Sequence, residues 1–116
     1  MSTIKIENVT EEKKPNKEGR LADKIILHST TKTGSIVEID ELAINGAGGI
    51  RKRGLWVTLD ADGRILKGSA IAELLEFNNV KTPLDLIGKD INVWWNPKGY
   101  IAAATFDLAE AEALKA

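Results

Sequence analysis

The segment from Gly88 to Asp107 constrains the fold more than any other part of this chain, because it predicts a β-hairpin. Ile91, Val93 and Trp95 take every second position, which is the period of two typical of a strand. The Asn-Pro-Lys-Gly run at positions 96–99 is typical of a tight turn, since proline presets φ and glycine accepts a positive φ. We expect the alanine-containing stretch after this turn to return as a second strand.

The two adjacent tryptophans of this hairpin should point to opposite faces of the sheet. Trp95 shares its face with Ile91 and Val93, so the alternation predicts a buried Trp95. Trp94 shares its face with Asn92, and we expect it to be an exposed platform. A bulge in the strand would exchange the two roles.

Length and composition predict one domain over residues 1–116, with enough apolar residues, 43%, to bury a core. No apolar run is long enough to span a membrane and no N-terminal signal pattern is present, so we expect a cytoplasmic protein without membrane partners. The chain has no cysteine and one histidine, His28, which disfavours a metal site; no cofactor is expected. Because the net charge is −1, any basic surface must be local.

The rest of the chain predicts strands, loops and two helical segments. Strands are expected over residues 3–9, 21–30, 35–42 and 55–59, with a polar loop over residues 10–20 and a glycine-rich loop over residues 45–54. A helix is expected from Ser69, a plausible N-cap, to Asn79. A second helical turn should begin after Thr82 and end at Gly88, and residues 107–116 should form a short terminal helix.

This order predicts a mostly β domain. Strands joined by hairpins, with one helix before the last two strands, fit a five-stranded Greek-key barrel of the OB-fold type, followed by a short C-terminal helix. A small α+β sheet would give a similar pattern.

The glycine-rich loop ends in three consecutive basic residues, Arg51, Lys52 and Arg53. It matches neither the G-x-G-x-x-G pattern nor the P-loop, so nucleotide hydrolysis has no motif here. The cluster is therefore either a solvated loop or a phosphate-binding loop. The lone His28 lies inside a predicted strand, where a hydrogen-bonded packing residue is the favoured interpretation.

The chain resembles the short single-stranded DNA-binding proteins of bacteriophages, particularly those of lactococcal phages. The resemblance lies in the size, the TIKIENV strand, the KGSAIAELLEF segment and the LIGKDINVWWNPKGYIA segment. It implies an OB-fold, sequence-tolerant binding of single strands, no catalysis, and a homo-oligomer with the dimer favoured.

Binding of single strands requires cations for the phosphates and aromatic faces for the bases. The candidate phosphate contacts are Arg51, Lys52, Arg53 and Lys98, with Lys13, Lys14, Lys17 and Arg20 as weaker candidates. The aromatic residues available for stacking are Trp56, Trp94, Trp95 and Tyr100, and because one or two of them should be buried, the candidate site includes Trp56, Trp94 and Tyr100.

The sequence therefore predicts a single-stranded DNA-binding protein that acts in phage DNA replication or recombination, with replication or recombination proteins as further partners. The alternative is a phage module that binds another protein, such as a host-factor inhibitor or a structural protein. We do not expect an enzyme, because no nucleophile and base are paired in the sequence.

Overall fold

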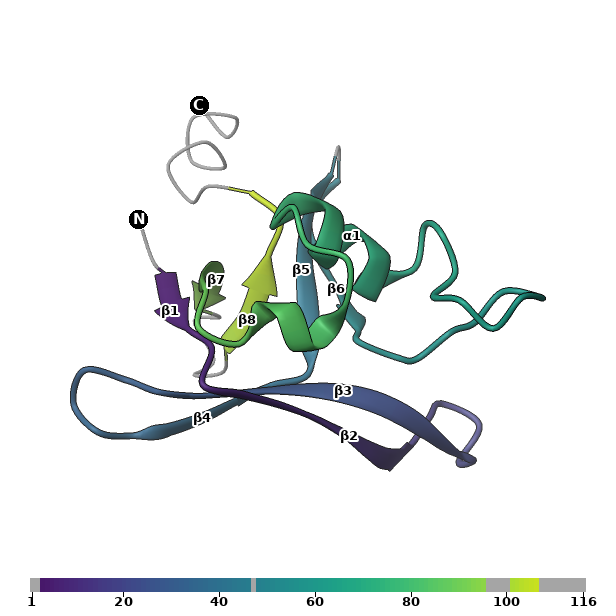
Figure 1. Cartoon of the computed structure of the whole chain (residues 1–116), viewed down its shortest axis with the longest axis horizontal. Helices are drawn as coiled ribbons and strands as arrows, with labels where there is room; N and C mark the ends of the chain where they lie inside the picture. Colours follow the sequence, from purple (N-terminus) through teal and green to yellow (C-terminus); the bar gives the residue numbers. More distant parts are fainter. Residues whose placement is uncertain (1–2, 47, 96–100, 107–116) are drawn as a thin grey trace.

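The computed structural model describes residues 3–46, 48–95 and 101–106, which form two β-sheets and one α-helix (Figure 1). The elements in chain order are β1 (Thr3–Lys5), β2 (Asn8–Pro15), β3 (Leu21–Thr30), β4 (Ile36–Ile39), β5 (Glu41–Gly46), β6 (Gly49–Gly54), α1 (Ala70–Phe77), the 3-10 helix η1 (Pro83–Leu86), β7 (Asp90–Trp95) and β8 (Ile101–Ala104). The mostly β class is confirmed, but the described residues form eight short strands in two sheets and not the closed five-stranded barrel that the sequence predicts.

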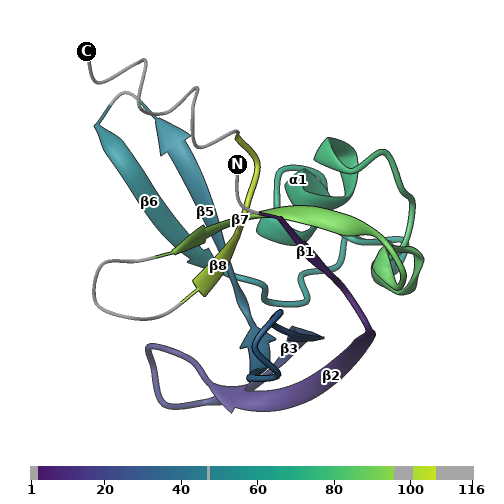
Figure 2. The same cartoon turned by 90° about the vertical axis from the view of Figure 1, so that its left-hand side faces the viewer.

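The five-stranded sheet has the order β1-β7-β8-β5-β6, and the three-stranded sheet has the order β2-β3-β4. Neighbouring strands are antiparallel except for β5 and β8, which run parallel. Figure 2 shows the β5–β6 hairpin rising away from the three-stranded sheet. In the large sheet, β1 and β6 form the two opposite edges.

The chain passes from one sheet to the other at two places, and this gives the sheets a common core. Only Ile6 and Glu7 separate β1 from β2, and only Asp40 separates β4 from β5. The main apolar cluster draws fully buried side chains from both sheets, and α1 and η1 pack onto it. Its most deeply buried members include Ile6, Leu27, Ile39, Leu42, Leu74, Leu86 and Ile91.

The predicted helix is confirmed, and its ends follow from local chemistry. The Ser69 hydroxyl accepts a hydrogen bond from the Ala72 backbone N–H at 3.2 Å, which satisfies a donor of the first turn. Ile71 and Leu74 bury the apolar side against the core. The helix ends at Phe77, and Asn79 two residues later has a positive φ of 56°, which is incompatible with a further helical turn.

The polar stretch after Val9 is a strand as far as Pro15, so the prediction of a loop over residues 10–20 is wrong for residues 10–15 and holds only for the turn at residues 16–20. β2 continues to Pro15 and pairs along its whole length with β3, which spans the residues that the sequence predicts. The connection is a tight turn in which Asn16 Oδ1 accepts hydrogen bonds from the backbone N–H groups of Glu18 and Arg20, each at 3.0 Å. Most side chains in the outer half of this ribbon face water, and this half can therefore consist largely of charged residues.

The predicted glycine-rich loop over residues 45–54 is also a hairpin, made by β5 and β6. Gly49 opens β6 with φ of 104°, a conformation that glycine adopts without strain. The strand expected over residues 55–59 is reduced to two isolated bridges, between Trp56 and Lys24 and between Leu59 and Ile65.

The pairing of β7 with β8 confirms the strands of the C-terminal hairpin. Its predicted turn at positions 96–99 and the predicted terminal helix over residues 107–116 lie outside the described residues. His28 has the packing role that the sequence favours, since its Nε2 lies 2.6 Å from Thr10 Oγ1 and its Nδ1 lies 4.0 Å from Glu38 Oε1.

Candidate nucleic-acid interface

The three consecutive basic residues lie on β6, at the edge of the large sheet, and not in a loop. Arg51 pairs with Ile44 and Arg53 with Leu42, so these two cations share the face of core residues. Lys52 pairs with Ala43 and shares the opposite face. The strand therefore presents positive charge on both sides of one sheet edge.

Two of these cations already have carboxylate neighbours. Arg53 Nη1 lies 3.7 Å from Glu73 Oε1 and donates to the Gly68 carbonyl at 3.3 Å. Lys52 Nζ lies 3.8 Å from Glu41 Oε1. Pairs of this exposure contribute only about 0–1 kcal/mol, so a phosphate oxygen can replace the carboxylate at little cost.

The third cation, Arg51, is exposed and forms no ion pair with any residue that the structure describes. Its guanidinium lies beside the hairpin turn, where Arg51 Nη2 is 3.9 Å from the position that a Cβ would take on Gly48. Arg51 is therefore available to an anionic ligand without the loss of an existing pair.

Trp56 lies in a hollow of about 320 Å³ next to this edge. Lys24 Nζ lies 4.6 Å from the centre of the indole, and the indole edge lies so close to Gly54 that a Cβ there would be 2.4 Å from Trp56 Nε1. The cations that line the same hollow are Lys17, Lys52 and Arg53, and Thr58 and Ser69 supply hydroxyls.

A second hollow, of about 260 Å³, is lined by Ile44 together with Arg51, Lys52 and Arg53. It shares two of its lining cations with the Trp56 hollow, so both belong to the same part of the surface. Among the described residues, no carboxylate lines either hollow. We call Lys17, Arg51, Lys52, Arg53 and Trp56 the cationic edge.

The structure places the other predicted site residues elsewhere. Trp94 is partly buried and packs against the small second cluster of Ala43, Ala102, Ala104 and Phe106, so it is not the exposed platform that the sequence predicts. Lys13 forms an ion pair with Asp23 at 3.0 Å. Lys14 and Arg20 belong to the β2–β3 ribbon and line neither hollow, and Lys98 and Tyr100 lie outside the described residues.

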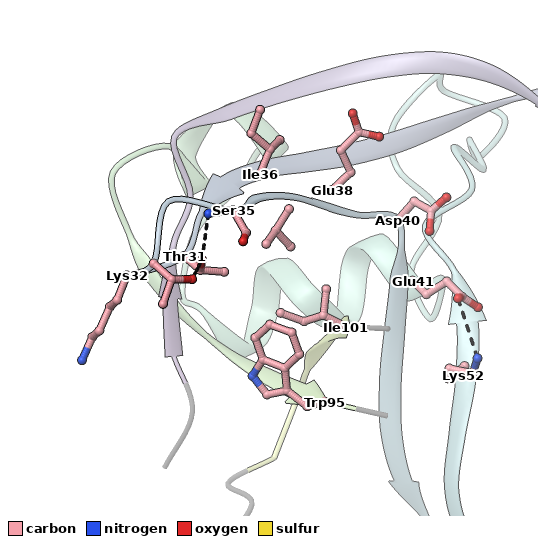
Figure 3. Close-up of a pocket in the computed structure, with 12 residues that line it drawn as sticks. Thr31, Lys32, Ser35, Ile36, Glu38, Asp40, Glu41, Lys52, Trp95 and Ile101 are labelled. Carbon is pink, nitrogen blue, oxygen red and sulfur yellow. Dashed lines mark hydrogen bonds and ion pairs between the residues drawn. The ribbon is translucent and has the colours of Figure 1, made fainter. Parts of the chain in front are cut away.

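Trp95 is the aromatic residue whose role the sequence prediction misplaces. It is 48% exposed, so the prediction of a buried Trp95 is wrong, although it shares the face of Ile91 and Val93 as expected. Its indole lines a separate groove of about 960 Å³ between β4 and the β7–β8 pair (Figure 3). Only the position of β4 relative to β7 reveals this groove, and no pattern along the sequence encodes it.

Neither a metal site nor a membrane-spanning helix is found in the described ranges. Those residues contain no group of three or more histidine, cysteine, aspartate or glutamate side chains that could hold a metal ion. No helix within them is long and apolar enough to cross a membrane.

Comparisons with known proteins place the chain in no family: no family model, curated protein or solved structure matches it.

Proposed function

We propose that this protein binds single-stranded DNA without sequence preference and serves the replication or recombination of phage DNA. The observation that carries the proposal is the cationic edge, where four basic side chains and an indole converge on two hollows without a lining carboxylate. Phosphates require the cations, and an unpaired base requires the aromatic face.

The strand connections support the proposal because they are compatible with those of an OB-fold. If β1–β2 and β4–β5 are taken as two bent strands, six strands remain: five that pair in a circuit, and β6, which is added to the edge of β5. Their pairings then run from β1–β2 to β3, to β4–β5, to β8, to β7 and back to β1. Helix α1 precedes the last two strands, which is the element order on which the sequence-based prediction of an OB-fold rests.

The place of the cationic edge in this arrangement also favours a nucleic-acid ligand. OB-folds bind oligonucleotides with their second and third strands and with the loop between the first two. Here the loop between the first two strands carries Lys17, which reaches the Trp56 hollow. The isolated bridge from Lys24 on β3 to Trp56 holds the indole beside the same surface.

A positive edge strand has a second explanation, since charged side chains also prevent edge-to-edge aggregation. That role requires no particular geometry and no aromatic neighbour. The convergence of Lys17, from the turn between β2 and β3, with Arg53 and Trp56 is not explained by that role. The alternative function is a module that binds another protein. The surface that favours it is the groove beside Trp95, which is separate from the cationic edge.

The test is a titration of the protein with fluorescent oligo-dT and with a duplex of the same length. We expect tighter binding of the single strand, and the Arg51→Ala/Arg53→Ala variant should bind oligo-dT roughly tenfold more weakly. The matched control is Lys5→Ala/Lys89→Ala, which removes the same charge beside the opposite edge of the sheet. Equal losses in the two variants, or equal affinity for duplex and single strand, would contradict the proposal.

A further inference from the structure

The groove beside Trp95 runs along the outer edge of β4. Three consecutive residues of this strand, Ile36, Val37 and Glu38, line the groove. Because successive side chains of a strand point to opposite faces, a cavity on one face would be lined by every second residue. A lining of consecutive residues therefore places the groove at the strand edge, and among the described residues β4 pairs only with β3.

The walls of the groove are apolar at the centre. Ile36 is 82% exposed, the largest exposure of any large apolar side chain in the described part of the chain. On the opposite wall Trp95 pairs with Ile101 across the β7–β8 ladder, and Figure 3 shows both side chains directed toward β4. The exposed indole and Ile101 form an apolar surface that a ligand would bury, whereas Ile36 and Glu38 project from the other side of β4.

The charges of the groove are unequal at its two ends. At one end Asp40 lies 3.3 Å from Lys24 Nζ and Glu41 lies 3.8 Å from Lys52 Nζ, so each has a cation beside it. Glu38, at the same end, is 61% exposed at its side chain and lies 4.0 Å from His28 Nδ1, which is charged only when protonated. At the other end the exposed Lys32 lies among hydroxyl side chains.

We propose that the β4 edge is a docking site for an extended segment of a partner protein, in which basic and apolar residues alternate. The segment adds a strand to the three-stranded sheet through main-chain hydrogen bonds, the mode called β-augmentation. Its apolar side chains lie on Trp95 and Ile101, and a basic side chain reaches Glu38.

This surface differs from the cationic edge in the sign of its charge. Three carboxylates and two lysines line the groove, whereas the two hollows of the cationic edge have no lining carboxylate among the described residues. A phosphate backbone in the groove would lie close to Glu38 and be repelled. The proposal is therefore independent of DNA binding and can fail without it.

The test uses three labelled synthetic peptides and follows their fluorescence anisotropy with the full-length protein. In the first peptide arginine alternates with valine, in the second glutamate replaces arginine, and in the third a central proline removes one main-chain donor. We expect the arginine–valine peptide to bind most tightly. The acidic peptide tests the charge of the groove, and the proline peptide tests pairing with the strand edge.

Two matched variants locate the site. Glu38→Gln should weaken binding of the arginine–valine peptide roughly two- to fivefold, whereas Lys32→Gln should leave it unchanged or strengthen it. Trp95→Ala should weaken it further, and Arg51→Ala/Arg53→Ala should have no effect. Equal binding of all three peptides, competition by oligo-dT, or occupation of the groove by a second copy that excludes the peptide would each overturn the proposal.

Discussion

Trp94 and Trp95 point to opposite faces of the sheet, as the alternation predicts, but the burial of both side chains differs from the prediction. The pattern predicts correctly that Trp95 shares a face with Val93, because strand geometry fixes side-chain direction. Burial depends instead on what covers that face. The second sheet covers Val93 but leaves Trp95 at the margin of a groove, while Ala102 and Phe106 cover part of Trp94.

Gly54 provides a test of the packing around the Trp56 hollow. A Cβ at this position would lie 2.4 Å from Trp56 Nε1 and 3.1 Å from Lys24 Cε, so Gly54→Ala must displace the indole. We expect a loss of about 1–3 kcal/mol in the free energy of unfolding, measured by urea denaturation, together with a changed tryptophan emission.

The matched control for this variant is Gly48→Ala. Gly48 lies just before β6, and a Cβ on it would lie 3.9 Å from Arg51 Nη2, the nearest atom among the described residues apart from its chain neighbours. This control should change the unfolding free energy by less than about 0.5 kcal/mol. Equal losses in Gly54→Ala and Gly48→Ala would show that the close contact with Trp56 has no energetic consequence.

At the scale of elements, the Asp85 carboxylate stabilises η1, and this stabilisation depends on pH. The Thr82 hydroxyl and the Thr82 backbone N–H, the latter at 3.0 Å from Asp85 Oδ2, donate hydrogen bonds that hold the pKa of the Asp85 carboxyl below its usual value. A lowered pKa in the folded state stabilises the protein above the unfolded-state pKa. This stabilisation is lost as the pH falls below about 4 and passes through the folded-state pKa.

The Asp85→Asn variant tests this dependence. Its Tm should lie below that of the unaltered protein at pH 7, and the difference should shrink as the pH falls below about 4. Asp62→Asn removes one carboxylate from an exposed turn and is the control for the loss of a single negative charge. A Tm difference for Asp85→Asn that stays constant from pH 7 to pH 3 would contradict the account.

The elements that the sequence predicts well are those with a one-sided apolar pattern or a specific cap. This group includes β3, α1 and η1. Leu27 and Leu74 are favourable only in the core, and Thr82 is favourable as the cap of η1. β2 and β6 do not belong to this group. Their polar residues lie on a ribbon or an edge with water beside them, so no alternation marks them as strands.

The candidate site, like the fold, has one part that the local sequence predicts and another that depends on long-range packing. The sequence identifies Arg51, Lys52, Arg53 and Trp56 from residue type, and the structure brings Lys52, Arg53 and Trp56 to the same hollow. The contribution of Lys17 depends on the curvature of the β2–β3 ribbon, and the Trp95 groove depends on the spacing of two sheets. Such long-range arrangements leave no local signal in the sequence.

At the scale of the whole molecule, the two proposed binding activities are assigned to two surfaces, the cationic edge and the Trp95 groove. The cationic edge lies on the hairpin that forms one edge of the large sheet, and the Trp95 groove lies along the edge of the small sheet. Lys52 lines both hollows and one end of the groove, where its Nζ lies 3.8 Å from Glu41 Oε1. A small β domain can in this way hold a polyanion and a protein segment on separate sheet edges.

The most direct test of the central claim is the salt dependence of oligo-dT affinity. Each phosphate neutralised on a single strand contributes about −0.7 to the slope of log affinity against log salt concentration. Replacing Arg51, Lys52 and Arg53 together with alanine should therefore flatten the slope by about two units while circular dichroism shows an intact fold. An unchanged slope in a folded triple variant would show that the cationic edge does not contact the DNA backbone.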